Sequence, residues 1–185
     1  MTSALRRAEP TAPAGAILIP GIAADGSLYP IEKMQAHRAA AFHLAISVFV
    51  FSQGELLIQR RALGKYHCGG QWANTCCTHP HWGEDAGVAA RRRLAEELGF
   101  STPLRETRVV DYRADVGSGL VEHERVHMYL GDVDRAEFRA RPDPDEVAEV
   151  RWVGAAALRA EIAADPDSFT PWFRIYVARF PDLAF

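Results

Sequence analysis

Residues 121–131 restrict the fold of this chain more than any other segment, because polar and apolar side chains alternate along them. In a β-strand this alternation puts two carboxylates on an otherwise apolar face, which consists of Glu122, Glu124, Val126, Met128 and Leu130. The opposite face, expected to be solvated, consists of His123, Arg125, His127 and Tyr129. A register shift of one residue would expose the apolar side chains, so both carboxylates are predicted to point inward.

Two like charges buried together need compensation. Glu122 and Glu124 would be costly to bury unless cations or a metal ion neutralise them, or unless one carboxyl stays protonated with a raised pKa. Either arrangement makes a functional site. The alternative is that this end of the strand frays into water and leaves both carboxylates solvated.

Three histidines elsewhere in the chain are candidates for this compensation. His37 lies in a polar segment, His43 opens an apolar stretch, and His79 follows a cysteine. Imidazoles and carboxylates together suit a divalent transition ion. The alternatives are that His43 is a core histidine bonded to the backbone and that His37 is a surface residue. The remaining histidines have no spacing that suggests a role: His67, His81, His123 and His127.

Residues 74–80, Asn-Thr-Cys-Cys-Thr-His-Pro, set a thiol two residues from an imidazole. In an extended chain, Cys77 and His79 lie on the same side. A cysteine beside an imidazole or a metal can be held as the thiolate, the form that attacks, binds metal or exchanges a proton. The alternative is a small buried thiol with a nearby surface histidine.

Periodicity in the rest of the chain predicts both strands and helices. Residues 41–60 indicate two strands joined by a tight turn at Ser52-Gln53-Gly54, and residues 84–98 indicate a helix followed by Gly99. Further strands are predicted at 107–112, 121–131 and 148–153, and helices at 155–164 and 172–180. This order predicts an α+β fold, an α/β sandwich with a mixed sheet between helices. We expect one domain over residues 16–185, preceded by a loose leader at 1–15.

Composition excludes several classes of partner. A net charge of −3 and a pI near 6.2 give no electrostatic footprint for nucleic acid or an anionic membrane, so a phosphate-bearing ligand needs local cations. The longest apolar run, residues 39–51, is too short to span a bilayer, and no signal segment is found. Three cysteines cannot form a disulfide framework, which favours a reducing, cytoplasmic location.

The predicted helix carries a near match to the Nudix signature G-x5-E-x7-R-E-U-x-E-E-x-G-U, where U is a bulky aliphatic residue. The match runs from Glu84 through Arg92 to Glu96, Glu97 and Gly99. It has two faults, because Thr78 stands at the first glycine and Arg93 replaces the glutamate after the arginine. The second fault removes a carboxylate with which such hydrolases hold magnesium. Considered without the motif, Arg92 and Glu96 form an ordinary i,i+4 ion pair on the helix surface. We keep this interpretation for these two residues.

From about residue 16 to its end, the chain resembles the type 1 isopentenyl diphosphate isomerases, which have a Nudix-like fold with a central mixed sheet flanked by helices. The resemblance rests on spaced matches: Glu32-Lys33 with His37, His43-Leu44-Ala45, Gln59-Arg60-Arg61-Ala62, Trp72 to Pro80, Arg93 with Glu97-Leu98-Gly99, Tyr112-Arg113, Glu122-His123-Glu124, and Ser168 to Trp172. Among these positions no functional residue of the family is missing.

The resemblance implies a role for each matched residue. Cys77 and Glu124 would be the catalytic pair, aided by the Tyr112 hydroxyl. The protein's own divalent metal, Mn²⁺ or Zn²⁺, would be held by His37, His43, His79, Glu122 and Glu124. Substrate-linked Mg²⁺ would be held by Glu97 and the backbone carbonyl of Cys77. The diphosphate-binding cations would be Lys33, Arg61, Lys65 and Arg93. Trp172 would stabilise a carbocation through its ring face, or serve as a helix-packing anchor.

The implied reaction interconverts isopentenyl and dimethylallyl diphosphate, a shift of a double bond used in isoprenoid biosynthesis. Water must be kept from a carbocation-like state, so the C-terminal helix is predicted to cover the pocket. The substrate is a small diphosphate, and a monomer or weak dimer is expected. The alternatives are a Nudix-type pyrophosphohydrolase, which Arg93 argues against, and a non-catalytic metal-binding or thiol-binding protein, which leaves the basic residues unexplained. Which member of the catalytic pair is the acid in each direction stays open.

Overall fold

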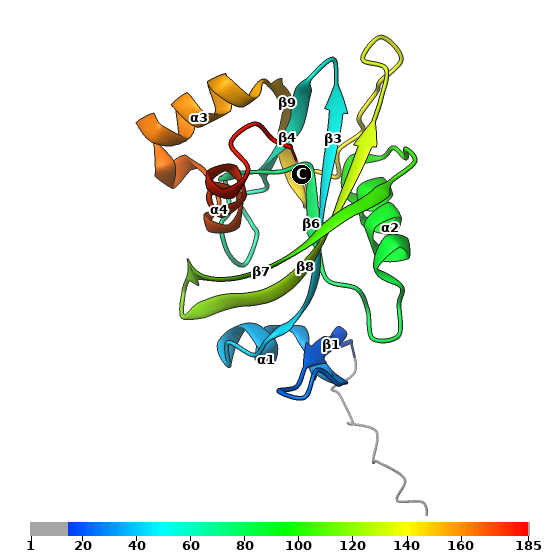
Figure 1. The fold of residues 1–185 in the computed structure, drawn as a ribbon, viewed down its shortest axis with the longest axis vertical. Helices are drawn as coiled ribbons and strands as arrows, with labels where there is room; N and C mark the ends of the chain where they lie inside the picture. The colour runs from blue at the N-terminus through cyan, green and yellow to red at the C-terminus, as the bar shows by residue number, and fades with distance from the viewer. Residues whose placement is uncertain (1–14, 185) are drawn as a thin grey trace, which may run out of the picture.

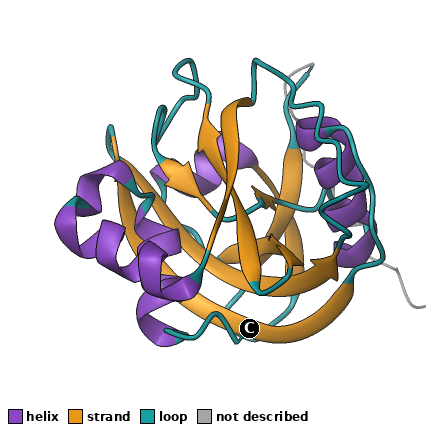
Figure 2. Ribbon diagram, turned by 90° about the horizontal axis from the view of Figure 1, so that it is seen from above, coloured by secondary structure: helices purple, strands orange, loops and turns teal. Residues whose placement is uncertain are grey.

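The computed structural model describes residues 15–184, so the expected leader at 1–15 lies outside it except for Gly15. Over the described residues the chain forms one connected nine-stranded sheet and four α-helices (Figures 1 and 2). The strands are β1 (Leu18–Ile22), β2 (Leu28–Glu32), β3 (His43–Ser52), β4 (Glu55–Arg61), β5 (Trp72–Ala73), β6 (Cys76–Thr78), β7 (Arg105–Gly117), β8 (Leu120–Asp132) and β9 (Val147–Val153). The helices are α1 (Lys33–Arg38), α2 (Ala86–Leu98), α3 (Ala155–Ala164) and α4 (Pro171–Arg179), with a short 3-10 helix, η1 (Pro166–Ser168). None of these described helices is long and apolar enough to cross a membrane.

Strand β3 is the centre of the sheet. It pairs parallel with β8 and antiparallel with β4 and β6, so the sheet is mixed as predicted. Helix α2 lies on one side of the sheet, and α3 and α4 lie on the other (Figure 1). Each side has its own apolar cluster, one including Leu94 and Leu98 of α2 and the other including Phe173 and Tyr176 of α4. The predicted α/β sandwich is therefore confirmed.

The turn of the predicted hairpin follows from its two central residues. Gln53 and Gly54 both have positive φ values, 53° and 81°, the backbone that a two-residue type I′ turn requires. Ser52 then pairs with Glu55 across the turn. The hairpin of β3 and β4 predicted from the sequence is confirmed.

Helix α2 begins two residues later than the sequence suggested, because Asp85 is its N-cap and accepts a hydrogen bond from Val88 N. Glu84 is thereby left outside the helix, where its two carboxylate oxygens each accept a 2.7 Å hydrogen bond from Arg92. Arg92 also pairs with Glu96, as predicted. Gly99 ends the helix in the left-handed region at φ 68°.

Strands β7 and β8 form a hairpin that is longer than predicted, at residues 105–117 and 120–132. On β8 the predicted inward face is buried, including Glu122 and Glu124 at 5% exposure each. The expectation of a solvated opposite face is wrong for Tyr129, which is buried in the apolar cluster under α2. His123, Arg125 and His127 on that face are partly exposed.

Two buried polar side chains fasten the segment that carries Cys77. Thr75 Oγ1 accepts from Val50 N at 2.9 Å and donates to Leu57 O at 2.6 Å. Asn74 Nδ2 donates to Val48 O and Cys76 O, each at 3.1 Å. β5 and β6 are too short to form many backbone hydrogen bonds with neighbouring strands. The side-chain bonds of Asn74 and Thr75 take their place and hold the Cys77 backbone against β3.

Replacing Thr75 with valine keeps the side-chain shape but removes both hydrogen bonds. Because Thr75 is fully buried, Val50 N and Leu57 O would be left unpaired, and Thr75→Val should lower the free energy of unfolding by about 1–3 kcal/mol. Urea denaturation measures this. The control is Thr107→Val, which loses one 3.2 Å bond at a partly buried site and should cost less. Equal losses in the two variants would contradict the fastening role of Thr75.

Candidate active site

One pocket is lined by residues of both α2 and α4, and it gathers most of the residues singled out by the sequence. Those that line it are Lys33, Arg61, Lys65, Cys77, His79, Arg93, Glu97, Tyr112, Glu122, Glu124 and Trp172. His37 and His43 lie next to this wall and are fully buried. Trp172 and Tyr176 of α4 contribute to the lining, so the C-terminal helix forms part of the pocket wall, as its predicted role as a cover requires.

Strand register explains why Cys77 and Glu124 face the same side. β3 lies between the two strands that carry them, with Ser47 paired to Cys77 and His43 paired to Glu124. Ser47 and His43 are four residues apart on β3 and so point to the same face. Their cross-strand partners do the same, which brings the thiol and the carboxylate into one pocket.

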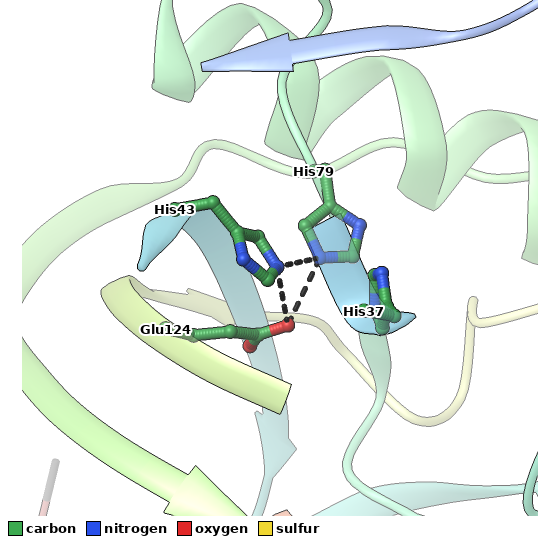
Figure 3. Close-up of side chains that lie close together, drawn as sticks. All are labelled: His37, His43, His79 and Glu124. Atoms are coloured by element: carbon green, nitrogen blue, oxygen red, sulfur yellow. Dashed lines mark hydrogen bonds and ion pairs between the residues drawn. The ribbon is translucent and has the colours of Figure 1, made fainter. Parts of the chain in front are cut away.

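His43, His79 and Glu124 converge on one point (Figure 3). His43 Nε2 lies 3.1 Å from His79 Nε2, and Glu124 Oε1 lies 2.9 Å from His79 Nε2 and 3.4 Å from His43 Nε2. Ligands at right angles around an ion with bonds of about 2.1 Å are about 3.0 Å apart. The three atoms are thus spaced like one face of an octahedral ligand shell.

Backbone hydrogen bonds fix the tautomers of two histidines. His37 Nδ1 donates to Lys33 O and His43 Nδ1 donates to Ala41 O, each at 2.7 Å, since a carbonyl can only accept. In the neutral imidazoles the Nε2 atoms therefore carry lone pairs, and His37 Nε2 is buried with no hydrogen-bond partner among the described residues. Such second-sphere bonds are typical of metal-binding histidines. Together with His79 and Glu124, these residues fit a divalent cation.

The two buried carboxylates are joined by one phenol. The Tyr112 hydroxyl lies 2.7 Å from an oxygen of Glu122 and 2.7 Å from an oxygen of Glu124. Burial and the charge of Glu124 raise the pKa of Glu122 well above its usual range. Burial also acts to raise the pKa of Glu124, but the neighbouring imidazoles of His43 and His79 hold it well below its usual range. These opposite shifts favour the sequence alternative in which one of the two carboxyls stays protonated.

Cys77 and His79 both line the pocket, on one side of the chain as predicted, but the His79 imidazole bonds to Glu124 and His43 and not to the thiol. The Cys77 thiol donates to Asn74 Oδ1 at 3.0 Å and lies 3.3 Å from Ser47 Oγ. Burial raises the pKa of Cys77 to about 12, opposed in part by the bonds to Ser47 and Asn74. The raised pKa keeps Cys77 as a thiol. Cys77 and His79 thus have different hydrogen-bonding neighbours.

Four cations surround the outer part of the pocket, as expected for a diphosphate site. Burial, together with the charges of Lys65, Arg93 and Arg61, lowers the pKa of Lys33 to about 8. The Arg61 guanidinium lies 5.4 Å from the centre of the Trp172 ring. These cations are close enough to affect one another, and an anion bound between them would relieve their repulsion.

Trp172 is positioned by the start of α4. Thr170 N donates to Trp72 O at 2.9 Å, which ties the residue before the helix to β5. The Trp172 side chain is 2% exposed and belongs to the apolar cluster, yet it also lines the pocket. The packing role considered from the sequence is therefore present, and stabilisation of a cation by the ring face stays a prediction.

Two residues of the pocket were missed by the sequence interpretation. Glu146 forms a short ion pair with Lys65, and its carboxylate lies 3.4 Å from Arg93 Nη2. His67 is 7% exposed and lies 3.6 Å from Glu122, although it had been assigned no role. Both residues lie in segments between or next to strands and reach the pocket only through the tertiary fold, so no periodic pattern indicated them.

Glu97 is also engaged within the pocket. Arg93 Nη2 donates to Glu97 Oε1 at 2.6 Å, and Gln59 Nε2 donates to Glu97 Oε2 at 3.0 Å. The other histidines lie away from the pocket, His81 exposed near Glu84, His127 bonded to Glu106 and His123 to Ala40 O. Their assignment to no role agrees with these positions.

Comparisons with known proteins identify a domain family that matches this chain and several similar proteins. The NUDIX domain family matches residues 41–173. A protein of Rhodobacter capsulatus named isopentenyl-diphosphate Delta-isomerase is 50% identical over 162 residues, which cover 87% of this chain and 92% of that protein. One of the same name from Ruegeria pomeroyi is 49% identical over 170 residues, covering 91% and 93% of the two chains.

Solved structures agree on the fold. The crystal structure of a Deinococcus radiodurans protein superposes with a TM-score of 0.71 at 18% identity, covering 88% of this chain and 98% of that one. A MutT NUDIX hydrolase from Burkholderia pseudomallei gives a TM-score of 0.58 at 22% identity, covering 75% and 98%. At these identities the likeness concerns the fold alone.

Glu146 predicts a measurable effect on anion binding. Its carboxylate bonds to Lys65, so it competes with an incoming anion and repels it, whereas glutamine keeps the shape and an acceptor oxygen without the charge. Glu146→Gln should bind inorganic pyrophosphate about tenfold more tightly than the wild type in calorimetric titrations without Mg²⁺, corresponding to about 1.4 kcal/mol.

The matched control is Glu161→Gln, which removes a carboxylate that pairs with Arg151 away from the pocket and should leave pyrophosphate affinity unchanged. Weaker pyrophosphate binding by Glu146→Gln would mean that the carboxylate supports the cations rather than competing for them.

Proposed function

Because the chain belongs to the isopentenyl-diphosphate Delta-isomerases of the NUDIX domain family, we propose that it interconverts isopentenyl diphosphate and dimethylallyl diphosphate. The reaction adds a proton to the terminal alkene carbon and removes one from the carbon on the other side of the branch point. The double bond moves by one position, and the diphosphate is unchanged.

The observation that carries this proposal is the presence of two separate proton-exchanging groups in one covered pocket. The Cys77 thiol lies on β6, while Glu124 lies on β8 with Tyr112 hydrogen-bonded to it. A double-bond shift needs one group to give a proton and another to accept one. The proton donor ends the forward reaction with one proton fewer and the acceptor with one more. The reverse reaction starts from these protonation states.

We assign the cations and Glu97 to the diphosphate. Lys33, Arg61, Lys65 and Arg93 supply charges for the phosphate oxygens, and arginine can bind them in bidentate fashion. Glu97 and the Cys77 carbonyl would hold a Mg²⁺ ion that arrives with the substrate. This anchoring places the hydrocarbon end of the substrate toward the thiol and the carboxylates.

Divalent metal dependence accompanies the family, and the residues that would hold the protein's own metal, Mn²⁺ or Zn²⁺, are His37, His43, His79, Glu122 and Glu124. When bound, such an ion supplies positive charge that offsets the buried carboxylates. Tyr112 keeps the oxygens of Glu122 and Glu124 at hydrogen-bonding distance, and burial keeps its own hydroxyl protonated by raising its pKa well above the usual range.

The cover formed by α4 suits a reaction that passes through positive charge on carbon. Trp172 and Tyr176 line the pocket with aromatic rings, and the helix keeps bulk water from the hydrocarbon. A ring face can stabilise a desolvated cation by about 2 kcal/mol. We assign this task to Trp172.

We also propose a cytoplasmic location, a monomer or weak dimer, and a single domain over residues 16–185. All three cysteines, Cys68, Cys76 and Cys77, are free, which supports a reducing compartment. The pocket is built from elements that run from α1 to α4 within one chain, which supports a single domain and needs no second copy.

The function is tested by proton NMR of isopentenyl diphosphate incubated with the protein and Mg²⁺ in deuterated water. Dimethylallyl diphosphate should form and carry deuterium, because the added proton comes from a group that exchanges with solvent. Cys77→Ala should abolish this, whereas Cys68→Ala should retain turnover, since its thiol does not line the pocket. Release of inorganic phosphate or pyrophosphate without isomerisation would contradict the proposal in favour of a hydrolase.

Trp172 predicts a second kinetic effect. If its ring face stabilises the cation by about 2 kcal/mol, Trp172→Ala should lower kcat about 30-fold, and Trp172→Phe should lower it less. Trp152→Phe is the control, because Trp152 packs against Phe138 under the other face of the sheet. Unchanged kcat in a folded Trp172→Ala protein would rule out this role.

A further inference from the structure

His67 is a buried imidazole for which the family pattern provides no role. It lies between β4 and β5, its backbone carbonyl accepts a 3.4 Å hydrogen bond from Arg61, and its ring is edge-on to Trp172 at 5.8 Å. Its Nε2 lies 3.6 Å from Glu122 Oε1, which is too long for a hydrogen bond, and its Nδ1 is buried without a partner among residues 15–184. Buried imidazoles are normally hydrogen-bonded, so His67 needs another explanation.

His67 belongs to a second group of possible metal ligands. Its ligand atom and those of His37 and Glu122 lie within 4.8 Å of one another, as do those of His37, His43, His79 and Glu124 in the first group. His37 is common to both groups. Because its Nδ1 is bonded to Lys33 O, it has a single nitrogen available, and one nitrogen binds one ion.

We propose that His67 is a sixth ligand of the divalent ion for which His37, His43, His79, Glu122 and Glu124 were assigned above. The two groups share His37 and together offer six ligand atoms, the number that one six-coordinate ion would take. The inference rests on the proposed metal site and adds a residue to it that the resemblance did not imply.

The spacing of the second group supports this assignment. The His67 to Glu122 separation of 3.6 Å would need to shorten by only a few tenths of an ångström to reach the about 3.0 Å of neighbouring ligands in an octahedral shell. Four imidazoles and two carboxylates suit a borderline transition ion.

The test is titration of the metal-stripped, full-length protein with Co²⁺, followed by calorimetry and by visible absorption. The wild type should bind one equivalent. His67→Phe, which keeps a ring of similar size, and His67→Gln should each bind Co²⁺ at least about tenfold more weakly. Their Co²⁺ absorption should intensify, because absorption strengthens as the coordination number falls below six.

Two control variants distinguish the sixth-ligand role of His67 from the existence of the metal site itself. His127→Phe alters a histidine that pairs with Glu106 outside the pocket and should match the wild type in affinity and spectrum. His43→Ala should lose the ion. If the His67 variants, shown to be folded by circular dichroism, bind Co²⁺ like the wild type, the sixth-ligand role is wrong while the metal site stands.

Two equivalents of Co²⁺ in the wild type, falling to one in the His67 variants, would also contradict a shared ion, because that result requires two separate sites. A wild-type protein that binds no Co²⁺ would overturn the metal site itself. Deuterium incorporation into product, measured on the same preparations, reports the isomerase reaction independently of these outcomes.

Discussion

Glu122 and Glu124 lie side by side on a buried face of β8, and the cost of burying two carboxylates explains the groups around them. Tyr112 bonds to both side chains, and the imidazoles of His43 and His79 converge on Glu124. Without compensating donors or cations, the strand would be unstable in this register. The same neighbours push the pKa values of the two carboxyls apart within one pocket, raising that of Glu122 and lowering that of Glu124.

The central strand β3 positions the two candidate catalytic side chains. It pairs with β8 on one side and β6 on the other, in a register that points Glu124 and Cys77 to the same face. Hydrogen bonds from Asn74 and Thr75 hold the short β6 segment in place of a longer ladder. The pocket also sets four cations against the two carboxylates of Glu97 and Glu146, which leaves an excess of positive charge for an anion.

Local patterns predicted the parts of the structure that depend on local chemistry. Alternation along β8, the tight turn at Ser52-Gln53-Gly54 and the helix that ends at Gly99 were all indicated by the sequence, and the structure confirms them. The strands β1, β2, β5 and β6 and helix α1 were not predicted, because segments of two to six residues are too short to show a period. Glu146 and His67 could not be placed, since their position depends on how connecting segments pack across the sheet.

The metal site beside the buried carboxylates is tested most directly by the position of a Mn²⁺ ion, located by its anomalous scattering in crystals of the full-length protein. One peak is expected about 2.1 Å from His43 Nε2, His79 Nε2 and Glu124 Oε1, because these atoms already have the spacing of neighbouring ligands. Absence of a peak there at saturating Mn²⁺, or a peak only beside Glu97, would contradict the claim that a metal ion compensates the buried carboxylates.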